Sequence, residues 1–187
     1  MYLWHNWGPK NWGVVEPGFI YRSGLMEPGQ VKRALQKNNI RVIVSLCGRD
    51  ASKEQVAQEI AARELGVEIL WLPMKGDGTT ADGTMDLHVA AVAAICKARR
   101  EGKPVLIQCG AGANRTGGVV AAYQLLVQRK NPQEVLAEMR EHRFDPHDNA
   151  VMLEFLNRNM RAAAQKLVEM GVIKDVPAVT AIPSKVE

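Results

Sequence analysis

One stretch of this chain decides its fold: Val105-Leu106-Ile107-Gln108-Cys109-Gly110-Ala111-Gly112-Ala113-Asn114-Arg115-Thr116-Gly117-Gly118-Val119-Val120. Branched apolar residues end at a cysteine, a loop of small residues follows, and a strongly apolar helical pattern comes after the loop. This order predicts a buried strand, a tight loop and a buried helix. The N–H groups of such a loop and the positive end of the helix dipole face one point, so we expect an anion site beside Cys109.

Length, composition and charge are those of an ordinary globular chain. The 187 residues are enough for one domain with a sizeable core. The net charge of +4 suits an anionic substrate. There is no block of Lys and Arg and no basic helix with interleaved aromatic residues, so the pattern does not favour nucleic acid as a partner. No apolar run is long enough to cross a bilayer, so we expect no stable membrane insertion.

Cysteine usage bears on the compartment. Three cysteines in a chain of this length do not make the disulfide framework of a secreted protein. The N-terminus also lacks the charged and apolar regions of a signal peptide. We expect a reducing, cytoplasmic environment, with a processed exported form as the open alternative. The pattern leaves the oligomeric state undecided.

Strand and helix patterns alternate along the rest of the chain. Strands are predicted at 19–21 (an edge strand), 40–46, 67–72 and 105–109, and helices at 31–38, 52–65, 87–102, 115–129, 131–142 and 149–170. This alternation predicts an α/β fold, a single domain with a central, mostly parallel mixed sheet of about four to five strands and helices on both faces. Helix ends are marked by Ser52 with Gln55, Gly66, Asn131 with Pro132, and Asp148.

The single domain, 1–187, has its predicted core at 11–170. Residues 1–10 are predicted to be an N-terminal arm on the domain surface, because the tryptophans there follow no period. An arm that binds a partner is the alternative. Residues 171–187, with prolines in the segment, are predicted to be a C-terminal tail that frays.

The loop before Arg115 has the length and composition of an oxyanion cradle. Its small side chains leave room for successive N–H groups to face a bound oxyanion. The planar guanidinium of Arg115 can grip two oxygens of that group. We expect a phosphate-sized oxyanion to be bound by Gly110, Ala111, Gly112, Ala113, Asn114 and Arg115.

The same surroundings favour the thiolate of Cys109, because a helix N-terminus and a guanidinium both lower a thiol pKa. A thiolate under a bound phosphoryl group is an in-line nucleophile, and the loop stabilises the charge that develops on the oxygens. Thr116 can hydrogen-bond the sulfur and assist its departure in a second step. The arrangement suggests a cysteinyl-phosphate intermediate that water hydrolyses. A merely structural cysteine would leave Arg115 facing a core without an acceptor.

The motif Cys109-x-x-Gly112-x-x-Arg115-Thr116, between a strand and a helix, resembles the signature of the cysteine-dependent protein tyrosine phosphatases. The short chain resembles their dual-specificity branch. The segments 11–18 and 20–24 are similar to the opening of small bacterial and fungal members, so the resemblance covers most of residues 11–170. It implies a central mixed sheet with helices on both sides, a phosphorylated substrate, and hydrolysis with no metal and no cofactor.

The family also uses an aspartate on a mobile loop as general acid, and then as general base for the attacking water. Asp77 lies in a glycine-rich polar loop 32 positions before Cys109, a separation similar to that of dual-specificity members. Asp82, five residues later, is the competing candidate. Asp86 is predicted to be an early helix residue that the helix dipole favours.

Two features depart from the family pattern. The family usually has a histidine directly before the cysteine, where it orients the loop and lowers the thiol pKa. Gln108 carries no charge, so we expect a less acidic thiol and a slower reaction. Phosphoinositide and inositol-polyphosphate relatives often have lysines inside the loop, and their absence here favours phosphotyrosine or another monophosphorylated group. Basic residues that could line the mouth are Arg22, Arg49, Lys75 and Arg143.

Cys47 follows the predicted strand 40–46 in a segment, 45–50, that resembles the phosphatase-and-tensin-homolog family. That resemblance implies a reversible disulfide with Cys109 that protects the nucleophile from over-oxidation. A small buried residue at a strand end is the equal alternative. Cys96 is predicted to lie in the core. The His and Asp residues of 142–148 fit no zinc spacing, so we expect no metal site.

The residues thus favour a phosphatase that acts through Cys109, Asp77 and Arg115, with phosphotyrosine or dual-specificity protein substrates. A phosphoinositide or inositol-phosphate phosphatase of the same fold is the first alternative. A phosphate-binding pseudophosphatase is the second, and Gln108 is its only support. A rhodanese-like sulfurtransferase also uses a cysteine in an anion-binding loop, but such loops do not usually end in Arg-Thr-Gly.

Overall fold

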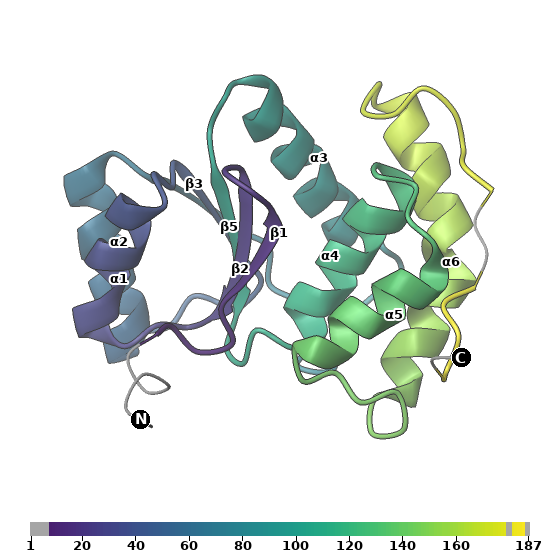
Figure 1. The fold of residues 1–187 in the computed structure, drawn as a ribbon, viewed down its shortest axis with the longest axis horizontal. Coiled ribbons are helices and arrows are strands. Elements are labelled where there is room, and N and C mark those ends of the chain that lie inside the picture. The colour runs from purple at the N-terminus through teal and green to yellow at the C-terminus, as the bar shows by residue number, and fades with distance from the viewer. Residues whose placement is uncertain (1–7, 179–180, 186–187) are drawn as a thin grey trace.

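The computed structural model describes residues 8–178 and 181–185, which form one α/β domain (Figure 1). In chain order its elements are β1 Gly13–Glu16, β2 Ile20–Gly24, α1 Pro28–Lys37, β3 Val42–Ser45, α2 Lys53–Leu65, β4 Glu68–Trp71, α3 Asp86–Arg100, β5 Val105–Cys109, α4 Asn114–Leu126, α5 Pro132–Glu141 and α6 Ala150–Glu169. The predicted fold class is confirmed.

The sheet has the order β1-β2-β5-β3-β4, in which β1 is antiparallel to β2 and the other pairs are parallel. The strand predicted at 19–21 is present as β2, but the prediction that it forms the edge was wrong, because β1 pairs with β2 and takes the edge. Only Val15 of β1 is buried, so this strand has no apolar pattern from which to predict it. The turn between the two strands contains Gly18, whose φ is 79°.

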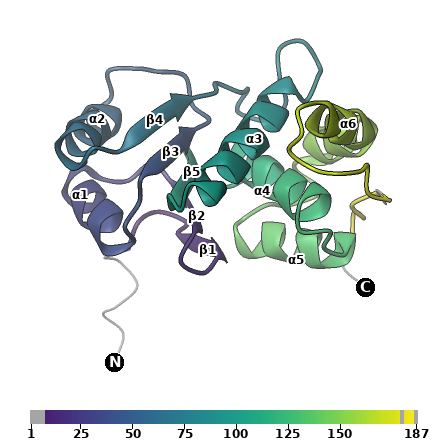
Figure 2. The same ribbon diagram turned by 90° about the horizontal axis from the view of Figure 1, so that it is seen from above.

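Helices cover both faces of the sheet, as predicted (Figure 2). α1 and α2 pack on one face, and α3 and α4 pack on the other with α5 and α6 against them. Alternate residues of β5 enter different cores: Leu106 lies in the core with α1 and α2, whereas Ile107 lies in the larger core with α3 to α6.

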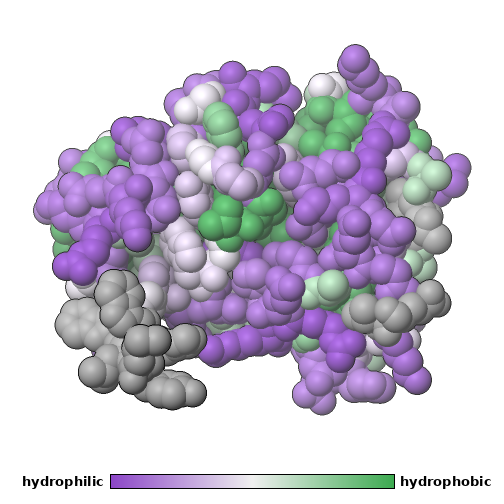
Figure 3. All heavy atoms as spheres, in the orientation of Figure 1, coloured by the Kyte–Doolittle hydropathy of each residue, from purple (hydrophilic) through white to green (hydrophobic). Residues whose placement is uncertain are grey.

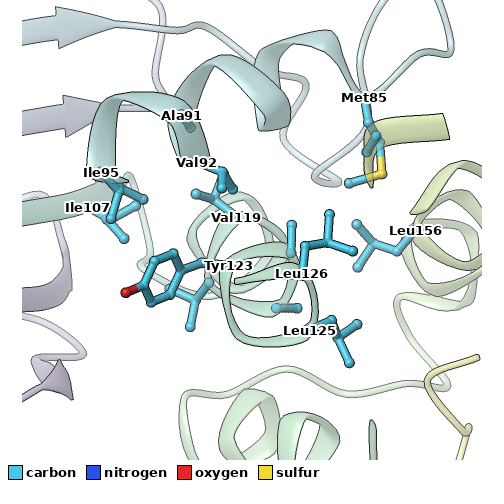
Figure 4. Packing of buried hydrophobic residues seen from close by; sticks show 14 of the residues in the cluster. Met85, Ala91, Val92, Ile95, Ile107, Val119, Tyr123, Leu125, Leu126 and Leu156 are labelled. Carbon is cyan, nitrogen blue, oxygen red and sulfur yellow. The ribbon is translucent and has the colours of Figure 1, made fainter. Parts of the chain in front are cut away.

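α4 is the central helix of the larger core. Every residue from Thr116 to Leu126 is buried. Tyr123 and Val119 of α4 lie among side chains of α3, β5 and α6 (Figure 4). A helix enclosed in this way has no polar face, which explains its strongly apolar sequence. This packing fixes the N-terminal end of α4, where the predicted anion site begins.

Most of the predicted helix ends are confirmed. The Ser52 hydroxyl accepts a hydrogen bond from the N–H of Gln55 at 3.4 Å, and Gly66 ends α2 with a φ of 64°. The Asn131 side chain accepts from the N–H of Gln133 at 2.8 Å. The prediction that Asp148 caps the last helix was wrong. α6 starts after Asn149 instead, because a turn that closes on the Asp145 carbonyl precedes it.

The C-terminal end of the chain differs from expectation where it is described. The tail does not fray at Ile182, which is 2% exposed. Its main-chain N–H and C=O both bond to the side chain of Asn157 on α6, at 2.8 and 3.0 Å. Because one side chain makes both hydrogen bonds, no periodic pattern in the sequence predicts this contact. The predicted N-terminal arm falls mainly on residues 1–7, which lie outside the described residues.

The face in Figure 3 is mostly hydrophilic, with small apolar patches. One patch lies over the part of the view where β1 runs, and Val14 of β1 is exposed. Within the described residues, no helix has both the length and the apolar character that a membrane span requires.

Candidate active site

The predicted strand, loop and helix lie at the edge of the sheet where the parallel strands end. β5 ends at Cys109, the loop covers 110–113, and α4 begins at Asn114. In Figure 1 this loop lies at the lower end of β5. The start of α4 therefore points its dipole at the loop, and a bound anion there is favoured.

The loop carbonyls are turned outward and bonded there. The N–H of Leu25 donates to the Gly110 oxygen at 3.3 Å. The Gly112 oxygen accepts from the Arg22 guanidinium at 2.8 Å and from the Asn11 amide at 2.9 Å. Carbonyls held outward leave the N–H groups facing the centre of the loop. In the described part of the chain, the N–H groups of residues 111, 113 and 114 donate to no other group and are available to a ligand.

Gly112 lets the loop lie against β2. Its φ is +72°, a conformation that costs other residues free energy, and a Cβ at this position would lie 2.5 Å from the carbonyl carbon of Ser23. Gly110 is less constrained, because a Cβ there would meet only the guanidinium of Arg115, at 3.3 Å. A glycine is thus required at position 112 because the loop main chain lies so close to the main chain of β2.

Arg22 supports the loop from beneath, which corrects the expectation that it lines the mouth. Its side chain is 0% exposed and forms an ion pair with Glu138 of α5 at 2.7 Å. A buried guanidinium needs an anionic partner, and Glu138 supplies it. Asn11 makes a parallel link, because its amide also donates to the His142 carbonyl at 2.9 Å. Sequence reasoning missed Glu138, Asn11 and His142 as supports of the loop.

Cys109 is buried within the loop, where its sulfur accepts a hydrogen bond from the Gly112 N–H at 3.2 Å. Burial raises the pKa of this thiol. The hydroxyl and main-chain N–H of Thr116, the charge of Arg115 and the Gly112 N–H together outweigh that effect, so the pKa of Cys109 is lowered. The structure therefore brings the predicted Cys109, Arg115 and Thr116 together and favours a thiolate.

Arg115 folds back from the start of α4 toward the end of β3. One of its terminal nitrogens lies 3.4 Å from the Leu46 carbonyl oxygen. Its buried Nε has no hydrogen-bond partner among the described residues. An unpaired donor of a guanidinium at an anion site is available to a ligand oxygen.

Asp77 is exposed on the loop between β4 and α3. Its carboxylate accepts hydrogen bonds from the N–H and the hydroxyl of Thr79, at 2.9 and 2.8 Å. Partial burial raises the pKa of this carboxyl, but the two bonds from Thr79 and the charge of Lys75 outweigh it, so the pKa is lowered. An aspartate in this turn is held as a carboxylate. It must leave the turn to act as a general acid.

Asp82 occupies a second turn of the same design, with Thr84 as its partner at 3.1 Å. Hydrogen bonds from Thr84 and Thr80 lower the pKa of Asp82. The two turns differ in their surroundings. A Cβ on the glycine after Asp77 would lie 3.4 Å from the Asn114 carbonyl carbon, whereas the glycine after Asp82 has open space around it. The Asp77 turn therefore packs on the start of α4.

Gln108 faces away from the thiol. Its side-chain amide donates to the Oε1 of Gln58 on α2, and both residues are buried. Successive strand residues point to opposite faces, so the side chain before Cys109 enters the core of α1 and α2. The uncharged amides of Gln108 and Gln58 thus form a buried pair on the face of β5 opposite to Cys109.

Cys47 is buried near the nucleophile. Burial raises the pKa of the Cys47 thiol, the charge of Arg115 lowers it, and the neighbouring Cys109 raises it. The main chain of Gly110 also lowers it, and the pKa of Cys47 is raised overall. Both cysteines are free thiols in this structure. Cys96 is buried in the core, as predicted.

The other basic residues expected at the mouth of the site differ in whether they already form ion pairs. Arg49 forms an ion pair with Glu59 at 2.8 Å and lies over the Trp71 ring at 6.0 Å. Lys75 and Arg143 are exposed. In the described ranges, no three His, Cys, Asp or Glu side chains are grouped so as to hold a metal ion.

A family model described as the dual specificity phosphatase catalytic domain matches residues 25–160. The chain is 32% identical over 130 residues to the dual specificity protein phosphatase TpbA of Pseudomonas aeruginosa, over 70% of this chain and 54% of that protein. It therefore spans about half the length of the curated relative that it matches.

Solved structures show the same fold. The crystal structure of P. aeruginosa TpbA has a TM-score of 0.67 at 24% identity, over 85% of this chain and 91% of that one. The catalytic domain of the PP-IP phosphatase SIW14 from S. cerevisiae, in complex with citrate, has a TM-score of 0.70 at 19% identity, over 88% and 94% of the two chains. The predicted central sheet with helices on both sides is the fold that they share with this chain.

Proposed function

This chain belongs to the dual specificity phosphatase family, and on that premise we propose that it hydrolyses phosphate monoesters through a cysteinyl-phosphate intermediate. The observation that carries the proposal is the cradle around Cys109. Its carbonyls are bonded outward, its N–H groups face inward, and the pKa of its thiol is lowered. These features bind an oxyanion and supply a nucleophile at the same point.

In the first step the Cys109 thiolate attacks phosphorus, an S–P bond forms, and the bond to the leaving oxygen breaks. Asp77 gives its proton to that oxygen. The loop N–H groups and Arg115 stabilise the charge on the three equatorial oxygens. This role requires Asp77 to leave its hydrogen bonds with Thr79, so we infer that the loop moves when substrate binds.

In the second step a water molecule attacks phosphorus and gives a proton to Asp77. The S–P bond breaks, inorganic phosphate forms, and the sulfur leaves as a thiolate. The Thr116 hydroxyl is buried, and Thr116 acts to lower the pKa of Cys109. A group that stabilises the thiolate makes it a better leaving group, so Thr116 assists this step.

We favour phosphotyrosine and dual-specificity protein substrates. No lysine lies within the loop, so the cradle offers one guanidinium for one phosphate group. The name of TpbA, a dual specificity protein phosphatase, supports a protein substrate. The name of SIW14, a PP-IP phosphatase, supports the alternative of an inositol-phosphate substrate.

A turnover panel tests the proposed function. The purified chain is incubated with phosphotyrosine and phosphoserine peptides, phosphoinositides and inositol phosphates, and released phosphate is measured against the Cys109→Ser variant as blank. We expect phosphotyrosine peptides to be hydrolysed with the highest kcat/KM. Faster release from inositol phosphates would instead assign the alternative substrate class. Phosphate binding without release from any substrate would indicate a pseudophosphatase.

Mild oxidation tests the proposed role of Cys47. We expect peroxide to convert Cys109 to a sulfenic acid, which the Cys47 thiol then attacks to give a disulfide and water. Peptide mass spectrometry should detect the crosslink, and dithiothreitol should restore activity. The Cys47→Ser variant is the control, and it should lose activity irreversibly under the same treatment. A wild-type protein that accumulates only sulfinic Cys109 would contradict this role.

A further inference from the structure

His88 is a buried titratable residue for which the mechanism above has no use. It lies on α3, is 0% exposed, and packs its ring against Phe155 of α6 at a centroid distance of 5.6 Å. Neither ring nitrogen makes a hydrogen bond of normal geometry among the described residues. Burial lowers the pKa of His88 to about 4, and an interaction with the main chain of Gly78 opposes that shift. The ring is therefore neutral near pH 7, with one N–H donor and one acceptor nitrogen.

A buried donor without an acceptor is costly, and an apolar residue of similar size would fill the same space without that cost. Buried polar groups in folded proteins are nearly always paired, so an unpaired one calls for an explanation. The main chain of Gly78 is the group that acts on this ring. Gly78 directly follows Asp77, the proposed general acid.

The ring lies against α4 just beyond the loop of the active site. A Cβ on Gly118 would lie 3.1 Å from the His88 Nε2, so the glycine makes room for the imidazole. The Asp77 turn reaches the same side of α4. A Cβ on Gly78 would lie 2.7 Å from the Met152 sulfur, and a Cβ on Gly118 would lie 3.1 Å from the Met152 methyl carbon. Met152 thus contacts both glycines.

The contacts follow one face of α4. The glycine after Asp77 packs on Asn114, and His88 packs on Gly118. Residues four positions apart in a helix lie on the same face, so both contacts fall within one turn after the cradle. At this point two groups are not in the state that catalysis would require. Asp77 is held by Thr79 as a carboxylate, and the imidazole has a donor without an acceptor.

We propose that His88 is a positioning residue for the loop of the general acid: its neutral imidazole donates a hydrogen bond to the Gly78 carbonyl when the loop closes over a bound phosphate. That bond fixes the main chain next to Asp77 and so sets where its carboxyl group meets the leaving oxygen. The inference rests on the proposed function and on Asp77 as its acid. His88 itself touches no reacting atom.

The test uses a series of aryl phosphates whose leaving phenols differ in pKa. A general acid matters most for poor leaving groups, so its loss steepens the fall of log kcat/KM with the pKa of the phenol. We expect His88→Leu to lower kcat/KM for phenyl phosphate about tenfold and to steepen this slope, because a misplaced acid protonates less effectively. His88→Asn and His88→Gln retain an N–H donor, and at least one of them should recover most of the lost activity.

Two further measurements separate this role from a structural one. In an Asp77→Ala background, His88→Leu should leave the slope unchanged, because it acts through the carboxyl that is already absent. The Tm of His88→Leu should equal or exceed that of the wild type, because the variant removes a buried unpaired donor. A lower Tm with an unchanged slope would overturn the proposal, as would an equal loss of activity for every phenol. Failure of the proposed function is distinct, since the wild type would then release no phenol from any aryl phosphate, or Cys109→Ser would retain turnover.

Discussion

Replacing Cys109 with serine should abolish turnover of phosphate monoesters and leave the oxyanion cradle in place. Serine lacks a thiolate, and the pKa of its hydroxyl is far above that of the thiol, which Thr116, the charge of Arg115 and the Gly112 N–H lower. Loss of a catalytic nucleophile lowers kcat by several orders of magnitude, so we expect a fall of at least about 10⁴-fold. Steady-state release of phenol from phenyl phosphate measures it.

Binding should survive the same change. The inward N–H groups of the loop and Arg115 do not depend on the sulfur, because the outward carbonyls are held by Arg22 and Asn11. Calorimetric titration with tungstate should give a Kd within about tenfold of the wild-type value. Cys96→Ser makes the same atomic change in the core of α3 and should retain turnover. Retained hydrolysis in Cys109→Ser would rule out the mechanism.

Replacing Asp77 with alanine should lower kcat/KM for phenyl phosphate by about 10²- to 10³-fold, the range of general acid catalysis. It should also change the pH profile. The thiol must be ionised, so activity rises with pH through the lowered pKa of Cys109. The acid must be protonated, so activity falls with pH through the lowered pKa of Asp77. The wild-type profile should therefore peak at acidic pH, and its descending limb should vanish in Asp77→Ala.

Asp82→Ala is the matched control for this change. Asp82 is exposed like Asp77 and has the same glycine and threonine after it and the same hydrogen bonds to the threonine, but its glycine packs on none of the described residues. The variant should keep both limbs of the profile and most of the activity. If Asp82→Ala loses the descending limb and Asp77→Ala keeps it, the assignment of the acid is reversed.

The parts of the structure that depend on neighbouring residues could be predicted from the sequence. The strand and helix around Cys109 follow from an unbroken apolar pattern, and Ser52, Gly66 and Asn131 act through bonds within a few positions. The strand β1 could not be predicted, because a partner strand stabilises it and only Val15 of it is buried.

The parts of the structure that depend on residues far apart in the chain could not be predicted from the sequence. Arg22 was expected at the mouth because nothing near it in the chain shows its partner, Glu138, which lies 116 positions away. The two candidate acids begin identical Asp-Gly-Thr triplets, at 77 and 82, so their sequence cannot separate them. The sequence does not distinguish His88 from its neighbours on an apolar helix, because its proposed role depends on Gly118 and on the Gly78 turn.

The hydrogen bonds that hold the loop carbonyls outward also bear on when the active site forms during folding. The loop is held by Arg22 at 90 positions and by Asn11 at 101, and Asn11 reaches His142 at 131. Contacts of such sequence separation form late, because chain entropy opposes them until most of the fold exists. The motif from Cys109 to Thr116 is complete in the nascent chain well before α5 is made. We therefore expect the loop amides to take their final direction only when the first strands and α5 are docked. On this expectation an emerging chain carries Cys109 for some time without the cradle that favours its thiolate.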